Sequence, residues 1–370
     1  MQFKKKMIAH PGKFIKAAYH HLPYIFGSDT APPPGTIFLV INSFCNLHCR
    51  MCDVGQKQKG TQFFKNMVKD TDEWSLDELK RFIDDVQSFN PIIAITSTEP
   101  LLHKNIIAIC EYIKRSGLFL QLTTNGYLLE QVSRDLVKSK VDEIFISLDG
   151  PERIHNYIRG NDYSYQKAVA GISAVNDWKM QLQMSTPRCK INYSISNYNY
   201  HCLIEFLENV KDLDIEHITF SHLNFITREM ARKHNALLQN IYRATPSSIS
   251  STNLNDIDID VLSAQISMAK KYYQNISFVP DLREKELFTY YKMPEIFLDN
   301  YKHCIVPWRA AQVLANGDLA ISTRCYHLDL GNVHQYPFLQ LWNGPLMKKF
   351  RKDLRNEHAF PACSRCCGLF

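Results

Sequence analysis

Three cysteines in the first part of the chain are spaced so that their thiolates could bind a single metal centre. Cys45, Cys49 and Cys52 form a C-x3-C-x2-C pattern directly after the apolar run 37–41. A cubane [4Fe–4S] cluster takes four cysteine ligands, so three thiolates would leave one iron open to a ligand from outside the protein. A zinc site or three reduced structural thiols are the alternatives, although zinc usually requires a fourth Cys or His at a finger-like spacing.

A second set of cysteines lies near the other end of the chain and comprises Cys304, Cys325, Cys363 and Cys366. Four thiolates would fully ligate a second [4Fe–4S] cluster, and Cys367 is then either spare or replaces Cys366. The segment 313–321 predicts a hairpin that turns at an Asn-Gly pair, which would bring Cys304 and Cys325 to the same end of the hairpin. A four-cysteine zinc ribbon is the alternative.

Strands alternate with helices between residues 36 and about 225. The predicted strands cover 37–41, 92–96, 118–123, 143–148, 190–195 and 217–220, and the predicted helices cover 76–86, 104–114, 130–139, 165–178 and 203–210. This alternation indicates parallel β/α units of the α/β class. Six units predict a partial (β/α)6 TIM-like barrel, open rather than closed, with functional residues on the loops at the carboxyl ends of the strands.

The remaining sequence divides into three segments. Residues 1–35 are predicted to form a basic helical extension that packs on the main domain or, alternatively, makes peripheral contact with a membrane surface. Residues 226–303 are interpreted as an insertion with a linker of low hydrophobicity at 244–252 and a short strand at 276–279. Residues 304–370 are predicted to be a small α+β domain built around the second cysteine set.

Composition limits the class of protein. The 370 residues are 45% hydrophobic and 22% charged, which is typical of a globular fold. The net charge of +6 comes without a long basic run, so we expect no nucleic acid partner. Eleven cysteines, an odd number and mostly clustered, favour metal ligation in a reducing, cytoplasmic compartment. No apolar run reaches 18 residues, so no transmembrane helix is predicted, and Pro11-Gly12 interrupts any signal peptide after Lys6.

The motif around Cys45, Cys49 and Cys52 resembles the radical SAM superfamily, where SAM is S-adenosylmethionine (AdoMet). The later cysteines resemble the SPASM/twitch extension of that superfamily, and the two resemblances cover about 36–225 and 304–367. They imply that the open iron chelates AdoMet and that one electron cleaves AdoMet to a 5′-deoxyadenosyl radical. The full SPASM form carries more downstream cysteines, so the twitch form with one auxiliary [4Fe–4S] cluster is expected.

The resemblance also implies AdoMet-binding residues at the strand ends. Glu99 lies where the family has Gly-Gly-Glu-Pro-Leu, a motif that holds the AdoMet amino group, although Ser97 and Thr98 replace the two glycines. Arg159 is expected to meet the AdoMet carboxylate, and Met51 to pack against adenine. The complete expected set is Met51, Ser97, Thr98, Glu99, Thr124, Asn125, Ser147, Asp149, Arg159, Asn192 and Ser194. The structural alternatives are an ordinary exposed acid for Glu99, a plain strand-ending turn for Thr124 and Asn125, and a surface ion pair for Arg159.

Three functions follow as hypotheses. The first is a radical SAM dehydrogenase of a sugar, aminocyclitol or related small polar metabolite, with the auxiliary cluster taking the electron and an external flavodoxin or ferredoxin type of reductant. The second is a peptide-modifying enzyme, either an epimerase, a crosslinking enzyme or a maturase. An epimerase would need a thiol as hydrogen donor, for which Cys189, Cys202 and Cys367 are the candidates. The third is a non-catalytic Fe–S or zinc-binding protein, which would not cleave AdoMet.

Overall fold

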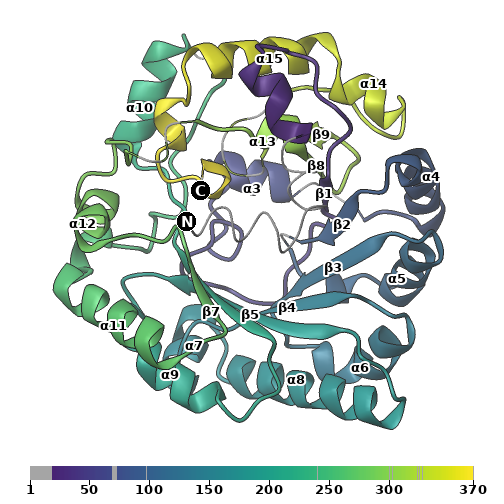
Figure 1. Ribbon diagram of the computed structural model, residues 1–370, viewed down its shortest axis with the longest axis vertical. Helices are drawn as coiled ribbons and strands as arrows, with labels where there is room; N and C mark the ends of the chain where they lie inside the picture. The colour runs from purple at the N-terminus through teal and green to yellow at the C-terminus, as the bar shows by residue number, and fades with distance from the viewer. Residues whose placement is uncertain are drawn as a thin grey trace.

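The computed structural model describes residues 19–68, 73–96, 98–239, 241–299, 301, 303–322, 324, 326 and 328–369. The expected AdoMet residue Ser97, the expected cluster ligand Cys325 and residues 1–18 of the expected N-terminal extension lie outside these ranges. The described residues form one central nine-stranded sheet with helices around its outer side (Figure 1). The α/β class, predicted from the alternation of strands and helices, is confirmed.

The strands follow the order β7-β6-β5-β4-β3-β2-β1-β8-β9 across the sheet. Neighbours from β7 to β8 are parallel, and only β9 runs antiparallel, to β8. Their bounds are β1 Thr36–Leu39, β2 Ile92–Ile95, β3 Phe119–Thr124, β4 Glu143–Ser147, β5 Arg188–Ile195, β6 His217–His222, β7 Ile276–Val279, β8 Ala310–Val313 and β9 Leu319–Ala320.

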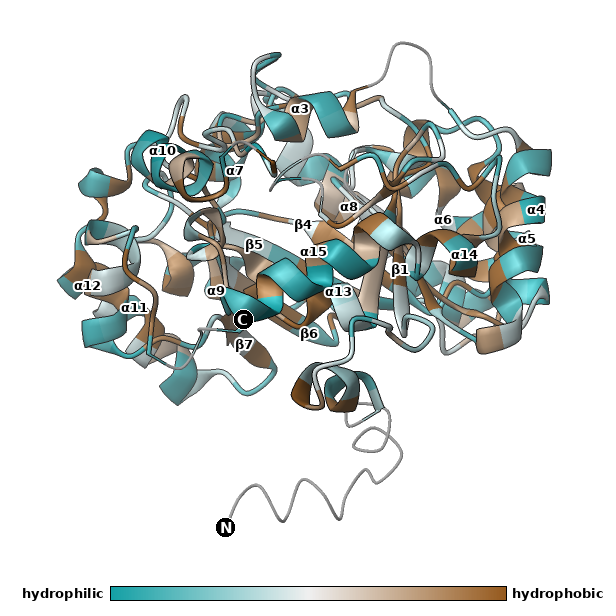
Figure 2. Ribbon diagram, turned by 90° about the horizontal axis from the view of Figure 1, so that it is seen from above, coloured by the Kyte–Doolittle hydropathy of each residue, from teal (hydrophilic) through white to brown (hydrophobic). Residues whose placement is uncertain are grey.

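The helices form the outer layer around the parallel strands and cover the two ends of the sheet (Figure 1). Their bounds are α3 Gln62–Met67, α4 Leu76–Val86, α5 Ile106–Arg115, α6 Leu129–Lys138, α7 Glu152–Arg159, α8 Ser164–Gln181, α9 Leu203–Val210, α10 Arg228–Leu237, α11 Ile259–Tyr272, α12 Glu284–Lys292, α13 Val306–Arg309, α14 Phe338–Trp342 and α15 Pro345–Asn356. Figure 2 shows apolar residues along the strands and the inner helix faces, and polar residues on the outer helix surfaces.

The sheet contains more parallel strands than the six predicted. Strand β7, which the sequence placed in an insertion, pairs in parallel with β6, so that Ile276 lies opposite Ile218. Strand β8 of the C-terminal domain pairs in parallel with β1, so that Ala310 lies opposite Thr36. Both added strands have four residues, which is too short for their hydrophobic pattern to indicate which sheet edge they join. The six strands predicted between residues 36 and 225 are all present as β1 to β6, and β7 and β8 extend the sheet beyond them.

The segment 244–252 packs into the molecule, whereas the sequence predicted a linker. Ser247 forms an antiparallel bridge with Ile226, and Ala244 forms one with Tyr326 of the C-terminal domain. The side chains of Ser247 and Ser248 are buried. Because buried backbone groups need hydrogen-bond partners, these bridges explain how a polar, serine-rich segment can lie inside the fold.

The described part of the N-terminal extension is a helix over residues 19–25 that packs on the C-terminal domain. The His20 ring nitrogen Nδ1 lies 3.3 Å from the carbonyl oxygen of Trp308, and the Tyr24 ring packs edge-on against the Trp308 ring at 5.2 Å between centroids. Leu22, Ile25 and other apolar side chains of this helix remain exposed. Across the described ranges, no helix has both the length and the apolar character needed to cross a membrane.

Candidate active site

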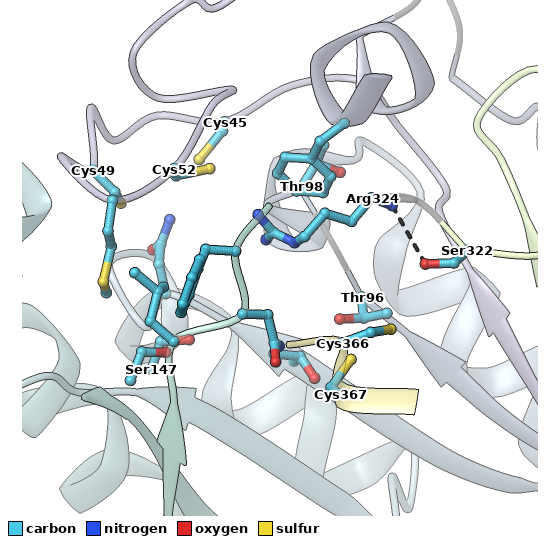
Figure 3. Close-up of a pocket in the computed structure, with 18 of the residues that line it drawn as sticks. Cys45, Cys49, Cys52, Thr96, Thr98, Ser147, Ser322, Arg324, Cys366 and Cys367 are labelled. Atoms are coloured by element: carbon cyan, nitrogen blue, oxygen red, sulfur yellow. Dashed lines mark hydrogen bonds between the residues drawn. The ribbon is translucent and has the colours of Figure 1, made fainter. Parts of the chain in front are cut away.

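A cavity of about 360 Å³ opens at the carboxyl ends of the parallel strands. The loop that follows β1 contributes Cys45, Cys49 and Cys52 to one side of the cavity, and Cys366 and Cys367 face it from the C-terminal domain (Figure 3). Since β1 and β8 are neighbours in the sheet, the topology brings the two ends of the chain to one cavity. The predicted location of functional residues on carboxyl-end loops agrees with this arrangement.

A second cavity of about 380 Å³ adjoins the first and is lined by Cys304, Cys363, Cys366 and Cys367. Thr96, Ser322 and the last two cysteines line both cavities, so they form a shared wall. The backbone N–H of Gly368 donates to the Cys366 sulfur at 3.4 Å. Within the described ranges, no three Cys, His, Asp or Glu side chains form a ready-made ion site. The described cysteines of each set therefore line a common cavity, but their side chains do not converge on a single ion position.

Arg159 places a buried positive charge beside the first cysteine set. Its guanidinium nitrogen Nη2 lies 2.5 Å from Asp149 Oδ2, and Nη1 lies 3.7 Å from the Cys49 sulfur. Burial raises the pKa of the Cys49 thiol to about 12, and the Arg159 charge opposes this rise. A cysteine ligates iron or zinc as its thiolate, so a cation beside Cys49 suits a metal ligand.

Helix α7 fixes the conformation of the cysteine loop. The backbone N–H of His48 donates to the Arg159 carbonyl at 3.2 Å, and that of Arg50 donates to the Ile158 carbonyl at 2.8 Å. The helix ends at Gly160, which has a positive φ of 65°. A Cβ atom at Gly160 would lie 2.9 Å from the His48 carbonyl oxygen. Glycine therefore permits both the left-handed turn and the close approach of the two backbones.

Glu99 joins the loops that follow β2 and β3. Its carboxylate accepts hydrogen bonds from the Thr124 hydroxyl at 2.7 Å, the Asn125 backbone N–H at 2.7 Å and the Leu101 backbone N–H at 3.0 Å. Burial raises the pKa of the Glu99 carboxyl to about 7, against the opposing effect of these donors. Glu99 is therefore buried and not an ordinary exposed acid, which was the structural alternative for this residue. It holds two strand-end loops together beside the cavity.

Most of the AdoMet-binding residues expected from the resemblance line the first cavity. These are Met51, Thr98, Glu99, Thr124, Asn125, Ser147, Arg159 and Ser194. Asp149 lies behind Arg159 and accepts a hydrogen bond from the Ser194 backbone N–H at 2.8 Å. Asn192 lies within β5, opposite Ser147 in β4. Asp149 and Asn192 are outside the cavity wall, so they support residues that line it rather than face a ligand.

The three candidate hydrogen-donor thiols are not equivalent in the structure. Cys189 is buried in the core near the start of β5, at the end opposite the cavity, and its pKa is raised to about 12 by burial. Cys202 is buried beside the first turn of α9, where its sulfur lies 3.3 Å from the Asn199 carbonyl oxygen. Neither thiol lines the cavity, whereas Cys367 does. Of the three candidates, Cys367 is thus the one that faces the cavity.

Sequence reasoning missed Arg324, Phe63 and the segment 223–226, all of which line the first cavity. Arg324 directly precedes Cys325, and this neighbour was the one available signal for it. Phe63 belongs to α3, within the polar stretch 53–73 that the sequence predicts to cover the mouth of the barrel, although no single residue of it was singled out. Their contribution depends on contacts between segments far apart in the chain.

Family models match both ends of the site. Residues 39–180 match the radical SAM superfamily, and residues 304–367 match the SPASM iron-sulfur cluster-binding domain. The chain belongs to the radical SAM superfamily and carries a C-terminal SPASM domain. Its cofactors are therefore AdoMet, the [4Fe–4S] cluster that binds AdoMet, and auxiliary iron–sulfur clusters in the SPASM domain. The cysteine sets at the two cavities fit these cofactors.

Two curated proteins are similar to this chain in sequence, and one solved structure is similar to it in fold. The Fe-coproporphyrin III synthase of Methanosarcina barkeri is 23% identical over 88% of this chain and 78% of its own length. An AdoMet-dependent heme synthase of the same organism is 29% identical, but the match covers 43% of this chain and 44% of that relative. SuiB of Streptococcus suis, solved with S-adenosylmethionine bound, has the same fold with a TM-score of 0.62 and 15% identity over 92% of this chain and 73% of its own.

Proposed function

We propose that this radical SAM enzyme is an oxidoreductase that removes a hydrogen atom from an organic substrate, after which the substrate radical loses a proton and passes its unpaired electron to one auxiliary [4Fe–4S] cluster. The observation that carries the proposal is the shared wall, because Cys366 and Cys367 line the same cavity as Cys45, Cys49 and Cys52. When bound, the cofactors supply the 5′-deoxyadenosyl radical on one side of the cavity and an electron acceptor on the other.

The residues of this chain then take distinct roles. Cys45, Cys49 and Cys52 hold the AdoMet cluster, and Cys304, Cys325 and Cys363 hold the auxiliary cluster together with Cys366 or Cys367. Arg159 favours the thiolate of Cys49, and Glu99 fixes the β2 and β3 loops against which AdoMet binds. The residues that position AdoMet in this proposal are Met51, Ser97, Thr98, Glu99, Thr124, Asn125, Ser147, Arg159 and Ser194.

We propose a carboxylate-bearing substrate of the tetrapyrrole type as the first class to test. The names of the two curated relatives concern Fe-coproporphyrin III and heme. Neither these two proteins nor SuiB is named for the sugar or aminocyclitol substrate expected from the sequence. Sugar and aminocyclitol substrates therefore have no support among them. A cavity of about 360 Å³ is at the small end of ligand sites, so a side chain of a large substrate would enter it. A peptide is the alternative, since SuiB has been solved with a precursor peptide bound.

The decisive experiment measures iron, sulfide and zinc per chain after anaerobic reconstitution, together with 5′-deoxyadenosine formation. Wild-type protein should hold about 8 Fe, corresponding to two cubane clusters. Replacing Cys45, Cys49 and Cys52 with Ala should leave about 4 Fe and abolish AdoMet cleavage. Replacing Cys304, Cys363 and Cys366 should also leave about 4 Fe but retain cleavage. Cys189→Ala, a buried thiol outside the cavity, is the matched control and should keep both clusters.

Two results would contradict the proposal. A wild-type protein with about 4 Fe and intact cleavage would remove the auxiliary cluster as electron acceptor. Zinc as the sole metal, without AdoMet cleavage, would favour the non-catalytic zinc-binding alternative. If the proposal is right, the C-terminal variant should form 5′-deoxyadenosine without oxidised product, because the substrate radical has lost its electron acceptor.

We also propose a cytoplasmic location and an external one-electron donor of the flavodoxin or ferredoxin type. The ten described cysteines are free thiols rather than disulfides, which suits a reducing compartment. A titration of the reconstituted protein with reduced flavodoxin, followed by 5′-deoxyadenosine formation, tests the electron donor. Formation with a chemical reductant but not with flavodoxin or ferredoxin would contradict it.

A further inference from the structure

Arg324 brings a positive charge into the first cavity, and none of the described acidic side chains pairs with it. Its side chain extends from the loop after β9 toward the middle of the cavity, between the first cysteine set and Cys367 (Figure 3). No other described residue forms an ion pair with Arg324. Its guanidinium carbon lies 4.2 Å from the centre of the Phe63 ring, and this cation–π contact holds the group in place without neutralising it.

The other two arginines of this cavity are already paired. Arg159 forms its ion pair with Asp149. Arg365 is fully buried, and its guanidinium donates to backbone carbonyls, including those of Tyr290 and Thr289 at 2.7 Å each. Arg324 differs because, among the described residues, only its Nη1 group has side-chain acceptors, namely the hydroxyls of Ser247 and Ser248. Its other N–H groups can donate to a ligand.

A buried carboxylate fixes the two serines that hold Arg324. The Ser247 hydroxyl donates to Asp53 Oδ2 at 2.7 Å, and the Ser248 backbone N–H donates to Asp53 Oδ1 at 2.9 Å. The Ser247 oxygen in turn accepts from Arg324 Nη1 at 3.0 Å. Donor and acceptor directions agree along this series of hydrogen bonds, so Asp53 orients Arg324 through Ser247. Within the described part of the chain, the guanidinium has no direct counter-charge.

We propose that Arg324 is a substrate-binding residue that takes a carboxylate or similar oxyanion group of the substrate. The planar guanidinium fork binds carboxylates through charge-assisted hydrogen bonds. The inference rests on the proposed function, whose substrate it describes. The AdoMet carboxylate has the same chemistry, but AdoMet is proposed to bind on the side of the cavity that carries the first cysteine set, whereas Arg324 comes from the C-terminal domain. The substrate is therefore the ligand we assign to Arg324.

The test uses phenylglyoxal, which modifies arginine side chains, on the anaerobically reconstituted holoenzyme. The rate of modification at Arg324 is measured by peptide mass spectrometry, with the exposed Arg232 as a reference in the same digest. Propionate is the probe, and propionamide and sodium chloride at equal ionic strength are the controls, because salt alone screens charges. Each condition is run with and without AdoMet.

We expect propionate at about ten times its dissociation constant to slow modification of Arg324 by about tenfold with AdoMet already bound, because the reagent reacts only with the unoccupied guanidinium. Arg232 should be unaffected, and propionamide should give no protection. Equal rates in propionate and chloride would overturn the assignment. Complete protection by AdoMet alone would overturn it as well, because Arg324 would then bind the AdoMet carboxylate.

The variant Arg324→Gln separates this inference from the proposed function. Its iron content and its AdoMet cleavage without substrate should equal those of the matched control Arg232→Gln. Loss of AdoMet cleavage with both clusters present would assign Arg324 to AdoMet and contradict the inference, while the radical enzyme itself would stand. Loss of cleavage in the wild-type protein would instead contradict the proposed function.

Discussion

At the residue scale, Glu99 combines a buried carboxylate with three hydrogen-bond donors. Burial dominates and raises its pKa from 4.5 to about 7. Between these pH values the folded protein keeps a proton that the unfolded chain releases. The contribution of Glu99 to the free energy of unfolding is therefore largest at low pH and falls as the pH rises through this window.

Glu99→Gln removes this titration and should change the pH dependence of stability. From pH 5 to pH 7.5, the free energy of unfolding of the wild type should fall relative to the variant by up to about 3 kcal/mol. Urea denaturation at several pH values measures the difference. Glu229→Gln, at an exposed acid whose pKa is lowered by its hydrogen bond to Arg232, is the control. Parallel curves for the wild type and Glu99→Gln would refute this account of Glu99.

Residue types with a fixed local spacing could be recognised from the sequence, and residues joined by long-range contacts could not. Cys45, Cys49 and Cys52 were assigned from their spacing over eight residues and from the family resemblance of that motif, and all three line the cavity. Arg324 is held at the site by Ser247, 77 residues away in the chain, which is itself fixed by Asp53. A contact of that kind leaves no periodic or motif signal in a single sequence.

At the element scale, helix α4 begins as the sequence predicted. The Ser75 hydroxyl accepts from the Glu78 backbone N–H, and the Glu78 carboxylate accepts from the Ser75 backbone N–H at 2.9 Å, so the capping box is confirmed. Both predicted ends of this helix also agree with the structure. Capping depends on neighbouring residues only, which is why the sequence is sufficient here.

Ser75→Ala should lower the free energy of unfolding by about 1 kcal/mol, because the first turn of α4 loses its hydroxyl acceptor. Urea denaturation measures this change, and iron content should be unaffected. Ser267→Ala, on the exposed side of α11, is the matched control and should change stability by less than about 0.5 kcal/mol. Equal effects of the two substitutions would show that the capping box does not stabilise the protein.

Assignment of strands to the sheet succeeded where helices separated them regularly and failed at its two ends. The strands β1 to β6 each follow the β/α alternation that predicts parallel neighbours. Strands β7 and β8 come from segments whose surrounding pattern is irregular, so their parallel pairing with β6 and β1 depends on tertiary packing. Their positions therefore required the structure.

At the scale of the whole molecule, Arg365 connects the C-terminal cysteine motif to helix α12. Its Nε and Nη groups donate to the carbonyls of Tyr290, Ile296 and Met293, among others. Burial lowers the pKa of Arg365 to about 10, so it stays charged at neutral pH. One side chain thus holds Cys363 and Cys366 against a segment that lies about 70 residues earlier in the chain.

Arg365→Gln should release this connection and weaken the auxiliary site. We expect about 4 Fe per chain instead of about 8, with AdoMet cleavage retained, because the carbonyls left without donors destabilise the α12 contact. Iron analysis after desalting measures the loss. Arg283→Gln, at an exposed arginine beside the start of α12, should retain both clusters. Retention of about 8 Fe by Arg365→Gln would contradict a supporting role for this side chain.

The position of β1 between β2 and β8 has a consequence for synthesis of the protein on the ribosome. One edge of β1 is paired only when Ala310–Val313 has emerged, long after Thr36–Leu39. At the usual rates of translation, this delay is roughly 15–55 s. During that interval the strand that precedes the cysteine loop presents unpaired backbone groups, which invite pairing with other chains. Completion of the sheet, and with it the shared wall between the cavities, must therefore follow release of most of the chain.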